Sequence, residues 1–386
     1  MEDISKFDDI RPYNDEEVAP VIKRLLNNPQ FREVVNSYLF PGKQWEQVEA
    51  LMQTFNSQFE LQHTLIKDIV FQLLNRTASC TTCTGMENIP RDKACTYISN
   101  HRDIVLDASL LSVLLANSNY NTVEIAIGDN LLLSEWIRDV VRLNKCFIVK
   151  RNVSMHQMLE TSRHLSEYIH YTIRDKNQSI WIAQREGRAK DSNDRTQEGL
   201  LKMLAMGSNQ EFLNSLMELN LTAVTFSYEY DPCDFLKAKE FQQKRDNPEH
   251  KKTPEDDAIN MKTGILGYKG SISLKFGHSI NSLLSNLDNS LGRNELVTQV
   301  ASIIDNEIFR NYHFYPVNYI AYDRLWGENT FQYKYTEKDI DQFDNYFRQQ
   351  LDKIDLPNKD IPYLMERMEE MYAYPLKNYL STENND

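Results

Sequence analysis

Apolar residues recur at helical spacing through the first 78 residues of the chain. The first set follows the spacing i, i+3, i+4, i+7 and i+8 and consists of Val18, Val21, Ile22, Leu25 and Leu26. Three further sets with helical spacing lie within residues 31–39, 48–55 and 65–74. Such a period is typical of amphipathic helices that bury one face. The pattern therefore predicts an α-helical N-terminal region over residues 1–78.

Short apolar runs alternate with longer amphipathic stretches after the SCTTCTG break at residues 79–85. Six of these runs have the length of strands, namely ACTYIS (94–99), TVEIAIG (122–128), KCFIV (145–149), SIWIAQ (179–184), LTAVTFSY (221–228) and SISLKFG (271–277). The alternation predicts an α/β domain over residues 79–330, in which helices flank a mixed central sheet. Residues 331–386 are predicted to form C-terminal helices and a disordered tail, STENND. The polar segment 241–257 is expected to be a mobile surface loop.

Charge and hydropathy narrow the functional classes. The 386 residues carry a formal net charge of −13, which argues against a partner nucleic acid, because affinity for the phosphate backbone comes from clustered Lys and Arg. No apolar run approaches the ~20 residues that span a bilayer. Met1 opens into acidic, polar sequence without the apolar core of a signal peptide. We therefore expect a cytoplasmic protein that can at most lie on the cytoplasmic membrane as a peripheral protein.

The five cysteines form an odd set in a long chain, which favours a reducing compartment over a disulfide framework. Cys80 and Cys83 have the spacing of half a zinc site. A structural zinc needs four ligands, and no second pair with ligand spacing follows. We therefore expect plain thiols in a turn and no metal.

The stretch YISNHRDIVLDASLLSVLL, residues 97–115, places charged residues where an apolar strand-like run becomes helical. If the strand ends near residue 100, His101 lies on the loop, and the amides at the following helix start point into the same space. A base beside an anion-stabilising corner suits acyl transfer. The triplet HRD also opens protein-kinase catalytic loops, but the required Asn is replaced by Ala108. A GxSxG nucleophile elbow is absent from the sequence.

This stretch resembles the first block of the glycerolipid acyltransferases, the family that acylates glycerol-3-phosphate and lysophosphatidate. Three further blocks follow in family order: KCFIVKR (145–151), IAQREGRAKDSNDRT (182–196) and AVTFSYEYDP (223–232). Two departures are visible. Five residues separate His101 from Asp107 instead of four, and the third block has Arg185 in place of Pro and no Thr between Gly187 and Arg188. Because an i, i+6 pair diverges on a continuous helix, His101 must precede the helix that carries Asp107.

The resemblance implies that His101 acts as general base and that Asp107 orients its ring, with Asp103 as the competing orienter. It also implies a substrate-binding set that holds the acceptor and its phosphate, namely Arg102, Lys150, Arg151, Glu186, Gly187 and Arg188. No cofactor is expected beyond the co-substrate, an acyl-CoA or an acylated acyl carrier protein that serves as thioester donor.

Two alternatives to an acyltransferase for lysophosphatidate or glycerol-3-phosphate stay open. The departures permit acylation of another amphiphile, such as an aminoacyl lipid, or a catalytically silent lipid-binding protein of the same fold. The partner surface is expected to be a membrane. Basic residues beside Phe235, Leu236 and Phe241 suggest an interfacial helix for this contact.

Overall fold

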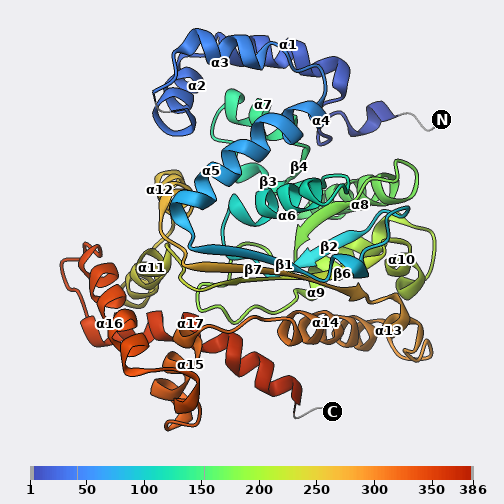
Figure 1. Cartoon of the computed structure of the whole chain (residues 1–386). Coiled ribbons are helices and arrows are strands. Elements are labelled where there is room, and N and C mark those ends of the chain that lie inside the picture. The colour runs from blue at the N-terminus through green and yellow to red at the C-terminus, as the bar shows by residue number, and fades with distance from the viewer. Residues whose placement is uncertain (1–3, 41, 152, 384–386) are drawn as a thin grey trace.

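A seven-stranded sheet lies at the centre of the computed structural model, which describes residues 4–40, 42–151 and 153–383 (Figure 1). The strands are β1 (Cys80–Thr84), β2 (Thr96–Ser99), β3 (Glu124–Gly128), β4 (Cys146–Val149), β5 (Ile180–Ala183), β6 (Leu221–Tyr228) and β7 (Ser271–Ser279). Their order across the sheet is β1-β7-β6-β2-β5-β3-β4. Neighbouring strands are parallel except for the antiparallel pair β6 and β7. The prediction of an α/β fold with a mixed sheet is confirmed.

Helices cover both faces of this sheet. They are α5 (Lys67–Thr77), α6 (Leu106–Asn117), α7 (Glu135–Leu143), α8 (Met155–Arg174), α9 (Glu198–Leu204), α10 (Phe212–Glu218), α13 (Asn281–Ser285) and α14 (Arg293–Arg310). Helices α11 (Asp234–Asp246) and α12 (Pro254–Leu266) lie together at one side of the sheet (Figure 1). Ile98 of β2 packs into a core with α8, α9 and α14, whereas its neighbour Tyr97 packs into a second core with α5 and α6. Successive strand residues thus enter opposite cores, which explains why the central strands read as continuous apolar runs.

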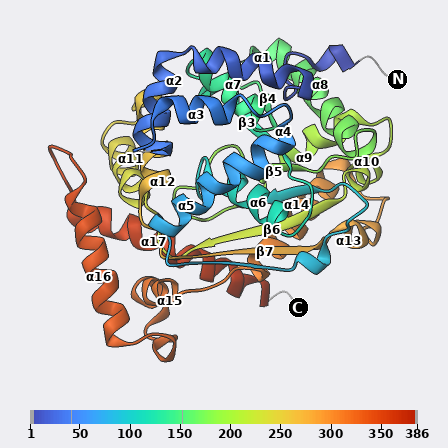
Figure 2. The same cartoon turned by 45° about the horizontal axis from the view of Figure 1, so that its top comes forward.

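The N-terminal helices form a separate layer at one end of the molecule (Figures 1 and 2). They are α1 (Asp15–Leu26), α2 (Pro29–Val34), α3 (Trp45–Met52) and the short α4 (Gln58–Glu60). Val18, Val21, Ile22 and Leu25 are buried in their common core, which also includes Leu143 of α7. The predicted helical N-terminal region is confirmed, and α7 joins it to the sheet.

The C-terminal helices lie on the opposite side of the sheet from α1–α3 (Figures 1 and 2). They are α15 (Pro316–Tyr322), α16 (Glu337–Asp352) and α17 (Ile361–Glu383). Their core already includes Val317 and Ile320 of α15, together with Ala238 of α11. The predicted division at residue 330 therefore falls between two helices that share one core. Among the described helices, none has both the length and the apolar character to cross a membrane.

Three local predictions are wrong. Cys80 and Cys83 lie in strand β1 instead of a turn, because the Thr-rich run CTTCT pairs with β7. Segment 241–257 is mostly helical, since α11 runs to Asp246 and α12 starts at Pro254 behind a Thr253 capping box. The first three residues of STENND belong to α17, whereas 384–386 lie outside the described residues.

A buried carboxyl group ties the C-terminal helices to the rest of the protein. Asp234, the first residue of α11, accepts hydrogen bonds from Tyr372 Oη of α17 at 2.7 Å and from Gln350 Nε2 of α16 at 2.6 Å. Burial, reinforced by the neighbouring Asp231 carboxylate, raises the pKa of Asp234 to about 7. The folded protein therefore retains a proton between about pH 4 and 7 that the unfolded chain releases.

We predict that the free energy of unfolding falls as pH rises from 5 to 8, and that Asp234→Asn reduces this fall. The wild-type carboxyl stabilises the fold below its unfolded pKa and loses that contribution as pH rises through about 7. Asn remains neutral across the range. Urea unfolding at several pH values measures the slope, and Asp341→Asn, at an exposed position of α16, is the control. An unchanged slope in Asp234→Asn contradicts the prediction.

Candidate active site

The loop between β2 and α6 carries the charged residues that the sequence places between a strand and a helix. Asn100, the first residue after β2, is buried and bonds to the backbone of Phe226 in both directions: its Nδ2 donates to the carbonyl and its Oδ1 accepts from the amide, each at 2.9 Å. This side chain extends the ladder between β2 and β6 by one step. His101 therefore leaves the sheet at a fixed position, on the loop as the spacing predicted.

His101 and Asp107 form a hydrogen-bonded pair. His101 Nδ1 lies 2.8 Å from Asp107 Oδ2, and the Asp107 side chain is fully buried while that of His101 is 12% exposed. The edge of the imidazole packs against Trp181 of β5, with 5.4 Å between ring centroids. The carboxylate selects the tautomer with a proton on Nδ1, so Nε2 is free to accept a proton from a ligand.

The two candidate carboxylates have different roles. Asp107 Oδ2 also accepts the backbone amides of Arg102 at 2.6 Å and Asp103 at 3.0 Å. Asp103 Oδ1 accepts the amides of Val105 and Leu106 at 2.9 and 2.8 Å and so caps α6. Asp107 is thus the residue that faces the imidazole. The protein's own carboxylates thus occupy four of the amides around this helix start, which leaves them unavailable to the predicted anion-stabilising corner.

Tyr228 is a site residue that the sequence analysis did not assign. Its hydroxyl donates to Asp107 Oδ1 at 2.9 Å, and burial beside Asp107 raises its pKa well above the ordinary value, so it remains a neutral donor. The signal was present in the sequence: Tyr228 ends β6, the parallel neighbour of β2. Carboxyl ends of adjacent parallel strands meet at one edge of the sheet.

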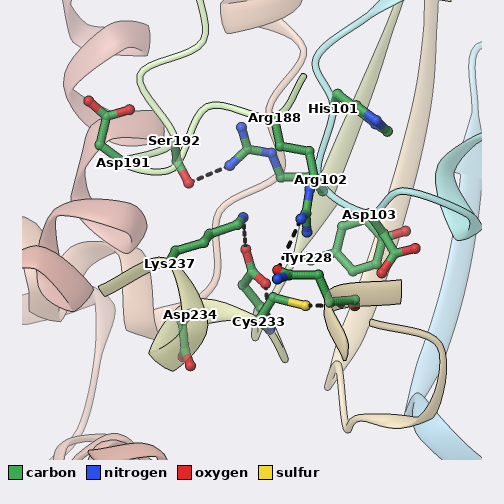
Figure 3. Close-up of polar contacts among 12 residues, drawn as sticks. His101, Arg102, Asp103, Arg188, Asp191, Ser192, Tyr228, Cys233, Asp234 and Lys237 are labelled. Atoms are coloured by element: carbon green, nitrogen blue, oxygen red, sulfur yellow. Dashed lines mark hydrogen bonds and ion pairs between the residues drawn. The ribbon is translucent and has the colours of Figure 1, made fainter. Parts of the chain in front are cut away.

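Two predicted phosphate ligands are occupied by other partners. Arg102 is buried and pairs with Asp194, while its Nη1 donates to Ser192 (Figure 3). Lys150 Nζ lies 2.5 Å from Asp9 Oδ2, beside the N-terminal segment. Both cations thus serve internal contacts.

The other predicted residues line a cavity of about 740 Å³ that reaches His101. Arg151, Glu186, Gly187 and Arg188 all lie on its wall, and Arg151 Nη1 is 3.4 Å from Glu186 Oε1. Gly187 has a φ of +68°, a left-handed conformation that a glycine adopts without strain and that lets the chain turn between its charged neighbours. The structure therefore places four of the six predicted substrate-binding residues in one cavity with His101.

Arg188 is the best-placed cation for an anionic ligand. Its Nη2 donates to Asn260 Oδ1 of α12 at 3.1 Å, whereas its buried Nη1 has no hydrogen-bond partner among the described residues. Figure 3 shows its guanidinium beside that of Arg102. Helix α12 approaches closely because Gly264 packs directly on the Asp103 carboxylate, where a Cβ would collide.

A more apolar groove of about 550 Å³ adjoins this cavity. The two share Arg151, Arg185 and Glu186 on their walls. The apolar residues of the groove come from β3, β4, β5, α8 and α9 and from the segment before α8, and they include Val149, Val153, Met158, Leu165, Ile182, Leu200 and Met203. The charged cavity at His101 thus continues into an apolar groove.

Part of the chain is similar to a known protein family. Residues 80–224 match the model of a family described as Acyltransferase. The matched segment includes His101 and Asp107, and it agrees with the resemblance seen in the sequence. The solved structure of the 1-acyl-sn-glycerophosphate (LPA) acyltransferase PlsC from Thermotoga maritima matches with a TM-score of 0.37 and 11% identity, over 75% of this chain and 94% of that chain. No curated protein matches significantly.

We predict that Asp107→Asn lowers the rate constant of acyl transfer by ~10²-fold or more, because it removes the charge that stabilises the imidazolium. Asp103→Asn should change it only a few-fold, since Asn is an equally good helix cap. Turnover of both variants, checked for intact folding by circular dichroism, separates the two roles. The opposite order of effects would assign the orienting role to Asp103.

Proposed function

We propose that this protein transfers a fatty acyl group from an acyl thioester to a hydroxyl of lysophosphatidate or glycerol-3-phosphate in phospholipid synthesis. One observation carries the proposal: the His101–Asp107 pair opens onto a cavity with Arg188 on its wall, within an acyltransferase domain. The pair supplies a base for a hydroxyl, and the guanidinium supplies a partner for a phosphate.

In the proposed mechanism, His101 Nε2 takes the proton from the acceptor hydroxyl as its oxygen attacks the thioester carbonyl carbon. Asp107 keeps the imidazole oriented and stabilises the imidazolium. The tetrahedral intermediate then expels the thiolate, and the protonated His101 gives its proton to this thiolate. The products are the ester and the free thiol, and no residue of the protein is acylated.

The acceptor phosphate would bind Arg188, whose planar guanidinium can donate two parallel hydrogen bonds. Arg151 contributes a second positive charge on the same wall, and Glu186 holds it at 3.4 Å. Arg102 and Lys150 have no such role here, because Asp194 and Asp9 engage them.

The acyl chain would occupy the apolar groove, and a membrane surface would deliver it. Support comes from Met155, Met158 and Leu159, which share one face at the start of α8 and are 89%, 54% and 59% exposed. Met158 also lines the groove, so the exposed face continues into it. This face replaces α11 as the candidate interfacial contact, since Phe235 and Phe241 of α11 pack against the C-terminal helices. The protein would act as a peripheral protein of the cytoplasmic membrane.

A panel of acceptors tests the reaction. We expect wild-type protein, given one long-chain acyl thioester, to acylate lysophosphatidate or glycerol-3-phosphate, as seen by mass spectrometry of the product. His101→Ala should lose at least ~10²-fold in turnover, because the base is removed. His278→Ala, at an exposed position of β7, is the matched control.

Other results of the panel would exclude the proposal. Acylation of an aminoacyl lipid alone would assign a different amphiphile as acceptor. Lipid binding without turnover of any thioester would identify a silent lipid-binding protein. Turnover that survives His101→Ala would remove the general base from the mechanism.

Arg188→Lys tests the phosphate contact. Lysine keeps the charge but loses the planar fork, so we predict a roughly tenfold higher acceptor KM with a nearly unchanged donor KM. Steady-state kinetics with each substrate varied in turn measures both constants. A rise in the donor KM alone would place Arg188 at the donor instead.

A further inference from the structure

A buried glutamate gathers three lysines on the wall of the cavity. Glu240 of α11 is only 4% exposed. Its carboxylate pairs with Lys190, with Lys244 at 3.0 Å and with Lys252 at 3.2 Å. Lys190, Lys244 and Lys252 are called the lysine cluster below. One carboxylate cannot neutralise three ammonium groups, and Asp257 adds only a weaker contact, at 3.8 Å from Lys252.

The surroundings add to this positive charge. Eight Lys or Arg and four Asp or Glu line the cavity. Because Lys237 pairs with Asp231 outside the lining, an excess of three positive charges remains, in a chain whose net charge is −13. Concentrating cations in a recess of an acidic protein is unfavourable unless an anion binds there. The cavity is therefore built for a ligand with several negative charges.

The lysine cluster is separate from the predicted phosphate contact. Lys190 follows Arg188 by two residues, but Lys244 lies on α11 and Lys252 on the connection between α11 and α12, which lie together at one side of the sheet (Figure 1). Lys244 and Lys252 also lie outside the matched acyltransferase segment, residues 80–224. All three lysines share the cavity with His101. A ligand that reaches both the His101–Asp107 pair and the lysine cluster must carry anionic groups at a distance from its reacting atom.

Building on the proposed acyl transfer, we propose that the lysine cluster binds the phosphate groups of the nucleotide arm of coenzyme A. The donor is then a coenzyme A thioester. Its diphosphate and its ribose phosphate are remote from the thioester and together carry several negative charges. Lysine ammonium groups suit such phosphates as compact point charges.

The depth of the cluster favours a small molecule over a carrier protein. The side chains of Lys190 and Lys252 are 26% and 30% exposed and that of Lys244 is 48% exposed, so two of the three lysines are recessed and all three are within reach of a ligand. An acidic carrier protein would need cations on an open surface. Because Glu240 already holds the three lysines together, less side-chain entropy is lost when a ligand binds.

Calorimetric binding of coenzyme A, without any acyl group, tests the assignment. Lys244→Ala and Lys252→Ala should each weaken binding about tenfold, the effect of losing one charge-assisted contact. Lys239→Ala, the same change on α11 but outside the cavity lining, is the matched control and should bind like wild type. In wild type, dephospho-coenzyme A and pantetheine should bind progressively more weakly. For pantetheine, which carries no phosphate, the three variants should not differ.

The outcomes also separate this proposal from the reaction itself. Undiminished binding of coenzyme A to Lys244→Ala and Lys252→Ala would overturn the cluster assignment. Efficient turnover of an acylated carrier protein by a wild-type protein that does not bind coenzyme A would overturn it while the proposed acyl transfer stands. A rise in acceptor KM alone in these variants would assign the cluster to the acceptor and overturn it as well. Coenzyme A binding that depends on the cluster, in a protein that acylates no acceptor, would support the site and reject the reaction.

Discussion

The Asp107 carboxylate organises the site. It accepts hydrogen bonds from the Arg102 and Asp103 amides and from the Tyr228 hydroxyl, and it pairs with the imidazole of His101. A buried carboxylate is tolerable only when donors satisfy its oxygens. These contacts meet that need, and in doing so they fix the loop, the first turn of α6 and the end of β6 relative to the base.

The architecture could be predicted because it follows from periodicity. The helical spacing in the first 78 residues and the apolar runs after residue 79 both reflect which side chains are buried. A strand that is buried on both faces of a sheet is recognisable as a continuous apolar run. The prediction of an interfacial contact on helix α11 is wrong for the same reason. Its Phe235 and Phe241 have the spacing of an interfacial helix, but they contact the core of α15–α17. Sequence spacing identifies an apolar face and does not identify what covers it.

The site was only partly predictable. His101 and Asp107 were found through the resemblance of one short stretch, which holds both residues because the loop and helix that carry them are close in sequence. The sequence made both Arg102 and Arg188 candidate phosphate ligands, and tertiary contacts separate them: Asp194 engages the first, while Nη1 of the second has no described partner. Asn260 and Glu240 gave no signal, because both act through partners far away in the sequence.

The ion pair between Arg102 and Asp194 joins two loops that carry opposite halves of the site. Arg102 directly follows His101, and Asp194 lies six residues after Arg188. Separating a buried pair leaves an uncompensated charge, so the two loops are held at one spacing. Under the proposed function, this fixed spacing selects acceptors by the distance between their hydroxyl and their anionic group. That distance depends on the number of bonds between the two groups and not on the rest of the acceptor molecule.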